Sequence, residues 1–452
     1  MRPLRPIALV AAAVALSACS TIQRVGAILP FGHGDATPRN AVPREGRVSI
    51  LASDQALTAD PSLASRTIVV PPTTELTAWS QPGGNETNSP PNAGGSATLQ
   101  QAWRADLGAG TNRHVTLSSV PVIAQGRLFF LDANQHVTAI DAANGHRAWS
   151  VALRPQHSRD HFAEGGGVAV ADGRVFVTTG YGFVVALDAS NGHEVWRAEG
   201  STPYQSSPTV AGGRLYAITN DSTLVAMDAN TGEVQWNFQA IAEPARIVAS
   251  PSVAVAGETV IAPFASGELA AVVSANGRRL WGDSLSRPGA LTSLSAINDI
   301  PGRPVVSNGV VYAASHSGVL VAINIITGQR IWAKPFASTQ TPCVIGDVVY
   351  AVSVDGELAA FDRTTGNVYW VKQLRRYRNQ EDHKGRVSWV GPIMVGSRLV
   401  LANSMGEVIG VTPANGEIVA HGSTGHAVFI PPVTANDQIF LVTDNAQLVV
   451  LR

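Results

Sequence analysis

The chain has 452 residues, of which 45% are hydrophobic and 14% are charged, with 43 glycines and a formal net charge of −1. This composition favours many short buried strands joined by tight turns over a helical protein. The near-zero net charge gives no general attraction for nucleic acid, so we expect no nucleic-acid partner.

The N-terminus has the features of a targeting segment. MRPLRP carries two arginines, and the apolar run IALVAAAVALSA after it is too short to span a bilayer as a mature helix. LSAC, which ends at Cys19, resembles the lipobox of bacterial lipoproteins. That resemblance implies a signal peptide over 1–19, lipidation of Cys19 and, because Ser20 rather than Asp follows, anchoring at the periplasmic face of the outer membrane. An ordinary signal peptide with an incidental cysteine is the alternative.

Residues 20–98 have the composition of a linker. Proline is frequent, and SQPGGNETNSPPNAGGS fills positions 80–96. We therefore predict a largely flexible tether. Two short apolar segments, 46–51 and 66–72, are exceptions that could add as strands or bind a partner.

From about residue 99 onward the chain repeats one phrase. Two apolar runs of strand length precede an Asp-x-x-x-Gly turn, and a tryptophan follows four residues after the glycine. Four short strands per unit make a propeller blade, and one large ring per blade suits packing between neighbouring sheets. The structural tryptophans of the repeat are Trp149, Trp196, Trp236, Trp281, Trp332 and Trp370.

The number of units predicts how the array closes. A seventh unit keeps Gly416 but has Ala420 at the tryptophan position, and residues 431–451 supply three further strands. The missing outer strand is available in 99–108, where Trp103 takes the position of the repeated ring. We therefore predict an all-β, eight-bladed β-propeller of four-stranded antiparallel blades over 99–452, its last blade closed by an N-terminal strand.

The repeat A-x-D-x-x-T/N-G-x-x-x-W resembles the quinoprotein (PQQ-type) propeller repeat over essentially all of 99–452. Two families share it: the PQQ-dependent alcohol and sugar dehydrogenases, and the BamB-type lipoproteins of the machinery that inserts β-barrels into the outer membrane. The lipobox, the total length and the lack of large insertions resemble the second family. That resemblance implies a non-enzymatic scaffold without a cofactor, with a BamA-like barrel assembly subunit as partner and unfolded outer-membrane proteins as clients.

A PQQ-dependent dehydrogenase or PQQ-binding sensor is the alternative. Such enzymes of the alcohol type need a calcium ion held by carboxylate and amide oxygens, an Asp base and often adjacent cysteines. Cys343 is the one cysteine of the propeller, and most acidic residues lie in hairpin turns. HSRDHFAEGGG at 157–167 is the best metal candidate, with a solvated loop as the competing interpretation. We expect no catalytic, cofactor or metal site. A polysaccharide-binding lipoprotein, a third class, would need exposed aromatic residues, and few of the nine tryptophans lie outside the repeat.

A binding platform would use the loops that join one blade to the next, and two of these loops resemble contact loops of the BamB family. In that family an Arg before a Ser/Ala-Pro, and an Asp-x-Asp before Pro-Val-Val, meet the barrel-forming subunit. In the loop 240–252, Arg246 fills the first position, with Ile247 as an apolar neighbour. In the loop 284–306, Asp299 matches the first acid, whereas Pro301 replaces the second. A simple rim charge is the alternative role for Arg246.

A third irregular loop, 372–392, is locally basic. Its arginines include Arg375 and Arg376, with Tyr377 and Trp389 nearby. We interpret Arg375 and Arg376 as candidate contacts to an acidic protein surface or to lipid headgroups. A solvent-exposed charge run is the alternative.

Overall fold

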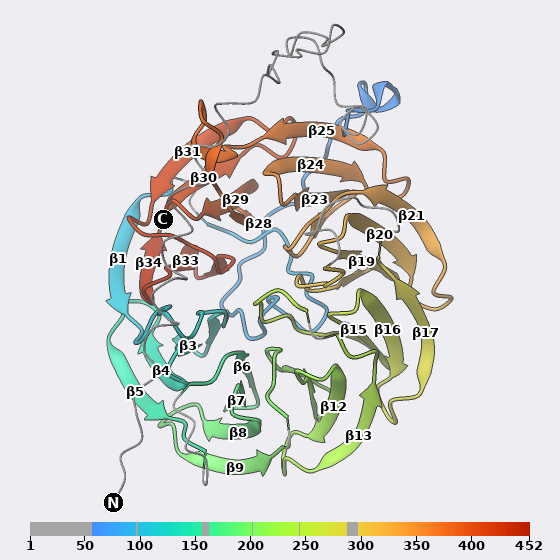
Figure 1. The fold of residues 1–452 in the computed structure, drawn as a ribbon. Coiled ribbons are helices and arrows are strands. Elements are labelled where there is room, and N and C mark those ends of the chain that lie inside the picture. Colours follow the sequence, from blue (N-terminus) through green and yellow to red (C-terminus); the bar gives the residue numbers. More distant parts are fainter. Residues whose placement is uncertain (1–56, 96–97, 156–161, 201, 244, 287–296) are drawn as a thin grey trace, which may run out of the picture. The chain divides into compact units, whose positions relative to one another are not determined.

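The propeller is a ring of eight four-stranded antiparallel sheets (Figure 1). The computed structural model describes residues 57–95, 98–155, 162–200, 202–243, 245–286 and 297–452. In blades one to seven, four consecutive strands run from the innermost to the outermost position. None of the helices in the described part of the chain is long and apolar enough to cross a membrane.

The first four blades each have four strands, and the inner strand has three residues in blades one, three and four but six residues in blade two. Blade one has β2 (Val122–Ala124), β3 (Arg127–Leu131), β4 (His136–Asp141) and β5 (Arg147–Ala152); blade two has β6 (Gly166–Ala171), β7 (Arg174–Thr179), β8 (Phe183–Asp188) and β9 (Glu194–Glu199); blade three has β10 (Thr209–Ala211), β11 (Arg214–Ile218), β12 (Thr223–Asp228) and β13 (Val234–Gln239); blade four has β14 (Ala254–Ala256), β15 (Thr259–Pro263), β16 (Glu268–Val273) and β17 (Arg279–Ser284).

Blades five and six begin with a three-residue inner strand, whereas the inner strand of blade seven has seven residues and follows a small inserted hairpin. Blade five has β18 (Val305–Ser307), β19 (Val310–Ala314), β20 (Val319–Asn324) and β21 (Arg330–Pro335); blade six has β22 (Cys343–Ile345), β23 (Val348–Val352), β24 (Glu357–Asp362) and β25 (Val368–Gln373); the hairpin is β26 (Tyr377–Asn379) and β27 (Lys384–Arg386); blade seven has β28 (Trp389–Val395), β29 (Arg398–Asn403), β30 (Glu407–Val411) and β31 (Ile418–Ser423).

Blade eight closes the ring with strands from both ends of the propeller. It combines β32 (Val433–Ala435), β33 (Gln438–Val442) and β34 (Gln447–Leu451) with the outer strand β1 (Gln101–Asp106). β1 pairs antiparallel with β34, from Gln101 opposite Leu451 to Asp106 opposite Gln447. The predicted eight-bladed fold and its closure by the N-terminal strand are thereby confirmed.

The repeated tryptophans join each blade to the next. The Trp149 indole N–H donates to the Ala189 carbonyl of blade two at 3.1 Å, and the ring lies against Gly192. Trp196, Trp236, Trp281, Trp332 and Trp370 make the same bond to the next blade at 2.7 to 3.0 Å. Gly is required in these turns because its φ is positive and because a Cβ would collide with the ring, as at Gly277 against Trp236.

Two local predictions need correction. Residues 165–167 belong in part to a strand and not only to a loop, because Gly166 and Gly167 begin β6, the inner strand of blade two. Gly166 has φ +85°, and a Cβ there would collide with the Thr178 carbonyl. The basic segment 372–392 is also not a plain loop, because it carries the β26–β27 hairpin.

The largest difference concerns the predicted flexible tether. Leu57 onward belongs to the same compact unit as the propeller, and residues 74–95, here called the central segment, cross the middle of the ring (Figure 1). Trp79 exchanges two main-chain bonds with Ile123 of blade one at 2.7 and 2.8 Å. Further bonds join the central segment to blade eight (Leu76 with Asn436), blade two (Ser80 with Val170), blade three (Gln81 with Val210), blade four (Glu86 with Val255), blade five (Thr87 with Val306) and blade seven (Ala93 with Gly396).

These contacts explain why the composition was misleading. Pro and Gly exclude regular secondary structure, but they do not prevent a chain from pairing with exposed strand edges. The inner strand of each blade offers such an edge to the central channel. Of the two apolar segments, Ile68 and Val70 in 66–72 pack against the core without forming a strand. Residues 46–51 and Cys19 lie outside the described residues.

Candidate functional site

The two faces of the propeller differ in their connections. Because neighbouring strands are antiparallel, the link from each outer strand to the next inner strand leaves on one face, which we call the loop face. It includes the described parts of 240–253, 285–304 and 374–388. The tight turns between first and second strands, and the Asp-x-x-x-Gly turns between third and fourth strands, lie on the opposite face, here called the turn face. A partner or ligand would find most of the irregular surface on the loop face.

Two predicted contact residues meet on the loop face. The Asp299 carboxylate is buried, with 2% of its surface exposed, and accepts the Ile247 amide at 2.8 Å. Arg246 is half-buried and donates to the Asn220 carbonyl at 2.6 Å. Burial raises the pKa of Asp299, although the amides of Ile247 and Ile300 and the charges of His316 and Arg246 counteract this rise. The structure therefore brings Arg246, Ile247 and Asp299 together.

Asp299 holds the neighbouring loop and does not offer its carboxylate to solvent. The bond to Ile247 ties the loop before blade five to the loop before blade four. Val248, beside this bond, is 50% exposed, and Ile241 in the same loop is 69% exposed. The surface available to a partner is thus Arg246 with Ile241 and Val248, while Asp299 fixes its shape.

The basic residues of the third loop lie on and beside the β26–β27 hairpin. Arg376 pairs with Asp355 at 2.7 Å and lies over the Tyr377 ring at 5.7 Å. Arg375 is exposed, and its guanidinium donates to the Tyr377 and Arg378 carbonyls at 3.1 and 2.8 Å. Half of the predicted pair is therefore neutralised within the chain, and Arg375 retains an exposed charge.

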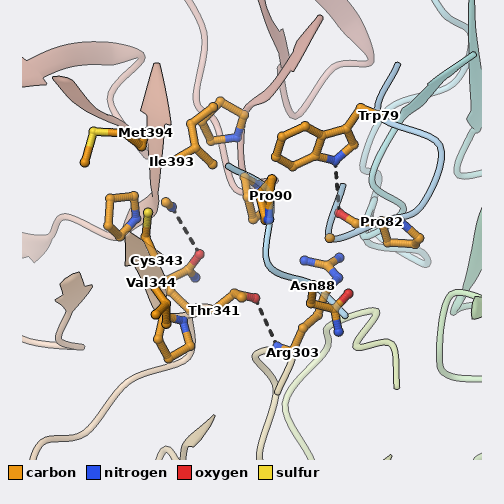
Figure 2. A pocket seen from close by; sticks show the side chains of 17 residues that line it. Trp79, Pro82, Asn88, Pro90, Arg303, Thr341, Cys343, Val344, Ile393 and Met394 are labelled. Carbon is orange, nitrogen blue, oxygen red and sulfur yellow. Dashed lines mark hydrogen bonds between the residues drawn. The ribbon is translucent and has the colours of Figure 1, made fainter. Parts of the chain in front are cut away.

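The central channel opens toward the loop face and is obstructed by the central segment. A cavity of about 370 Å³ forms its mouth, lined by Ser118, Thr341, Ser388, Phe429 and other residues that precede the inner strands. Deeper, a cavity of about 50 Å³ is bounded by Trp79, Pro82 and Pro90 of the central segment (Figure 2). Both cavities share Arg303.

Arg303 was not singled out by the sequence analysis. It is 7% exposed, and its side chain extends toward the central segment (Figure 2). Its backbone N–H donates to the Thr341 hydroxyl at 3.0 Å, and Nη2 donates to the Ser250 carbonyl at 3.3 Å. A signal was present in the repeat: an Arg stands before the inner-strand proline where the other units have small or apolar residues.

The channel residues do not fit a calcium-dependent quinone cofactor. Calcium requires six to eight oxygen ligands, including carboxylates. Across the described residues no three His, Cys, Asp or Glu side chains gather as a metal site. Asp444 is the one carboxylate in the lining of the mouth. Cys343 lines the deeper cavity, and burial raises its pKa to about 12, so the group there is a protonated thiol. Residues 157–161 of the metal candidate lie outside the described part.

Comparisons with known proteins agree with the repeat. Residues 157–372 match the family model described as outer membrane protein assembly factor BamB, and residues 92–173 match the β-propeller domain of glucose, ethanol and alcohol dehydrogenases. The chain is 25% identical over 190 residues to outer membrane protein assembly factor BamB of Moranella endobia, covering 42% of this chain and 47% of that protein. The matched region spans about half the length of the curated relatives.

Solved structures show the same fold in both functional groups. BamB from Moraxella catarrhalis superposes with a TM-score of 0.65 at 20% identity, over 78% of this chain and 99% of that one. Quinohemoprotein alcohol dehydrogenase from Comamonas testosteroni gives 0.62 at 15% identity, over 83% and 80%. At these identities the likeness concerns the fold alone. The repeat, the eight four-stranded blades and the two family matches together make the chain similar to the PQQ-like β-propeller proteins.

Proposed function

We propose that this chain is a non-enzymatic scaffold of outer-membrane β-barrel assembly. It would be anchored through lipidated Cys19 at the periplasmic face of the outer membrane and would bind a BamA-like barrel assembly subunit. The match of residues 157–372 to the BamB family supports this role. The poor fit of the channel to a calcium-dependent quinone argues against the dehydrogenase alternative.

The observation that carries the proposal is the fixed loop pair before blades four and five. A protein-binding surface needs apolar residues that are exposed and also held in place. Ile241 and Val248 are exposed, Arg246 lies between them in sequence, and the bond from Ile247 to buried Asp299 fixes the loop. In this proposal Arg246 and Val248 contact the barrel subunit, and Asp299 is a positioning residue.

The remaining loop-face charge has a secondary place in the proposal. Arg375 is exposed beside a hairpin that projects from blade six, whereas Arg376 is paired with Asp355. We assign Arg375 to an acidic protein surface or to lipid headgroups at the edge of the assembly. Arg376 would act by holding the hairpin in place.

Client binding would use the outer rim. The outermost strand of each blade has one unpaired edge, and an unfolded outer-membrane protein can add a strand to such an edge through main-chain bonds. Several outer strands also expose one apolar side chain for a client to cover: Val195, Val234, Leu280, Ile331 and Val419.

Co-purification from detergent-solubilised membranes tests the scaffold role. We expect the intact protein to recover a barrel assembly subunit, and an Arg246→Glu, Val248→Asp double variant to lose it. Arg278→Glu, an exposed charge in a turn-face hairpin, is the matched control and should retain the subunit. Recovery by all three proteins would keep the role but reject these contact residues. If the intact protein recovers no barrel subunit, the scaffold role is rejected.

A further inference from the structure

The buried guanidinium of Arg303 has no counter-charge in the described structure. None of the ion pairs among the described residues includes it, and its Nε–H, which is inaccessible to solvent, has no hydrogen-bond partner there. Its one side-chain bond goes to the neutral Ser250 carbonyl. Burial alone lowers the pKa of Arg303 to about 10, and no carboxylate counteracts this shift. At neutral pH the side chain is therefore a buried, unpaired cation.

A buried charge without a partner is strongly unfavourable, and native proteins normally compensate it. The residues around Arg303 compensate its charge poorly. Trp79, Pro82, Pro90 and Met394 contribute apolar walls to the deeper cavity (Figure 2). In such an environment the electrostatic attraction for an anion is much stronger than in water. An anion entering the channel would thus gain more from Arg303 than from any exposed arginine.

The shape of the channel sets the size and direction of such a ligand. The central segment obstructs the end near the turn face, so access is from the mouth on the loop face. The mouth has about 370 Å³ and offers the hydroxyls of Ser118, Thr341 and Ser388, while the space near Arg303 narrows to about 50 Å³. A small molecule fits these volumes, with its charged end at the narrow part.

The chemistry of the donor selects the ligand class. A guanidinium is planar, and its Nε–H and Nη–H point in parallel, which matches the two oxygens of a carboxylate or a phosphate. A monatomic anion such as chloride cannot use both donors equally well. We propose that the central channel is a binding site for a small oxyanion, either a carboxylate or a phosphate, held by the guanidinium of Arg303.

Titration calorimetry on the full mature chain tests this site. Sodium malonate and inorganic phosphate are the two probes, measured separately against sodium chloride at matched ionic strength. We expect saturable one-site binding of at least one oxyanion and none of chloride. The stronger probe identifies carboxylate or phosphate as the preferred class.

Two variants connect binding to the residue. Arg303→Met keeps most of the side-chain volume without the charge, and we expect it to weaken binding about tenfold or more, as for loss of a charged hydrogen bond. Arg378→Met removes an exposed arginine of the β26–β27 hairpin and should bind like the intact protein. Equal binding by Arg303→Met, or no oxyanion binding by the intact protein, would overturn the proposal.

A crystallographic measurement keeps the test independent of variant folding. Crystals of the intact protein soaked in selenate, a heavier oxyanion, should show an anomalous peak within hydrogen-bond distance of the Arg303 guanidinium. A structure with only water at this position under saturating selenate would reject the site.

Discussion

Replacing Trp79 with alanine tests whether the central segment is part of the cooperative fold. Trp79 is 4% exposed and anchors the segment to blade one. A buried Trp removes roughly 150–250 Å² from water, which at about 25 cal/mol per Å² corresponds to about 4–6 kcal/mol as an upper bound. The indole N–H contributes little, because its bond to the Pro82 carbonyl is long, at 3.4 Å.

We therefore expect Trp79→Ala to lower the free energy of unfolding by about 3–4 kcal/mol, near the lower part of the range for Trp truncations. We expect a value in the lower part of that free-energy range because the Trp79 indole borders a cavity of about 50 Å³ and so lacks packing contacts on that side. Urea unfolding followed by far-ultraviolet circular dichroism measures the change. Val69→Ala, at a 75% exposed position of the same N-terminal stretch, should stay within about 0.5 kcal/mol of the intact protein.

Limited proteolysis separates the two ways in which this reasoning can fail. An unchanged urea midpoint with new cleavage inside 74–95 would show that the central segment detaches locally, apart from the ring. An unchanged midpoint with no new cleavage would refute the argument from burial. A large loss of stability without prior local cleavage is the expected result.

Three further predictions follow from single contacts. Gly277→Ala places a methyl group about 2.5 Å from the Trp236 ring at φ +70°, and should lower thermal stability by about 1–3 kcal/mol, whereas Gly257→Ala, at a similar φ with open space around it, should cost about 1 kcal/mol. Burial raises the pKa of Asp299, so the folded chain binds a proton at this carboxylate more tightly than the unfolded chain does. The contribution of Asp299 to the free energy of unfolding therefore falls as the pH rises from about 3.8 through the folded pKa. In Asp299→Asn, urea midpoints measured between pH 4 and 7 should lack this pH-dependent decrease. Burial raises the pKa of the Cys343 thiol to about 12, so alkylation by iodoacetamide at pH 8, read by peptide mass mapping, should be roughly 10³-fold slower than for a free cysteine; a rate near that of the free thiol would contradict it.

The repeat was sufficient to predict the propeller, because each unit contains the turn residues and the packing tryptophan of one blade. Asp-x-x-x-Gly requires a tight turn, and the tryptophan four residues after the glycine packs against the corresponding glycine of the next blade. Trp103 could be assigned to the last blade for the same reason, and its ring does lie against Gly145. Its buried indole N–H, however, has no hydrogen-bond partner among the described residues, and the repeat did not predict this difference from the other blades.

The central segment and the channel could not be predicted in this way. The segment has no periodic pattern, because its main chain pairs with a different blade every few residues and its side chains meet a different environment each time. Asn88 illustrates this: its amide donates to the Val253 and Pro304 carbonyls of two neighbouring blades. Asp299 was selected by its position in a motif, but only packing reveals that its carboxylate points inward to Ile247.

The pairing of β1 with β34 also bears on how the protein is made. β1 is the first propeller strand to be synthesised, yet its partner is the last strand of all. Until that strand has emerged, β1 keeps an unpaired edge, and the contact between the two ends is among the most distant in sequence that the chain can make. Contacts of this kind form late and slowly. Ring closure therefore requires a chain that extends through β34. A chain truncated before β34 cannot close the propeller, and its exposed strand edges would make it a substrate for degradation.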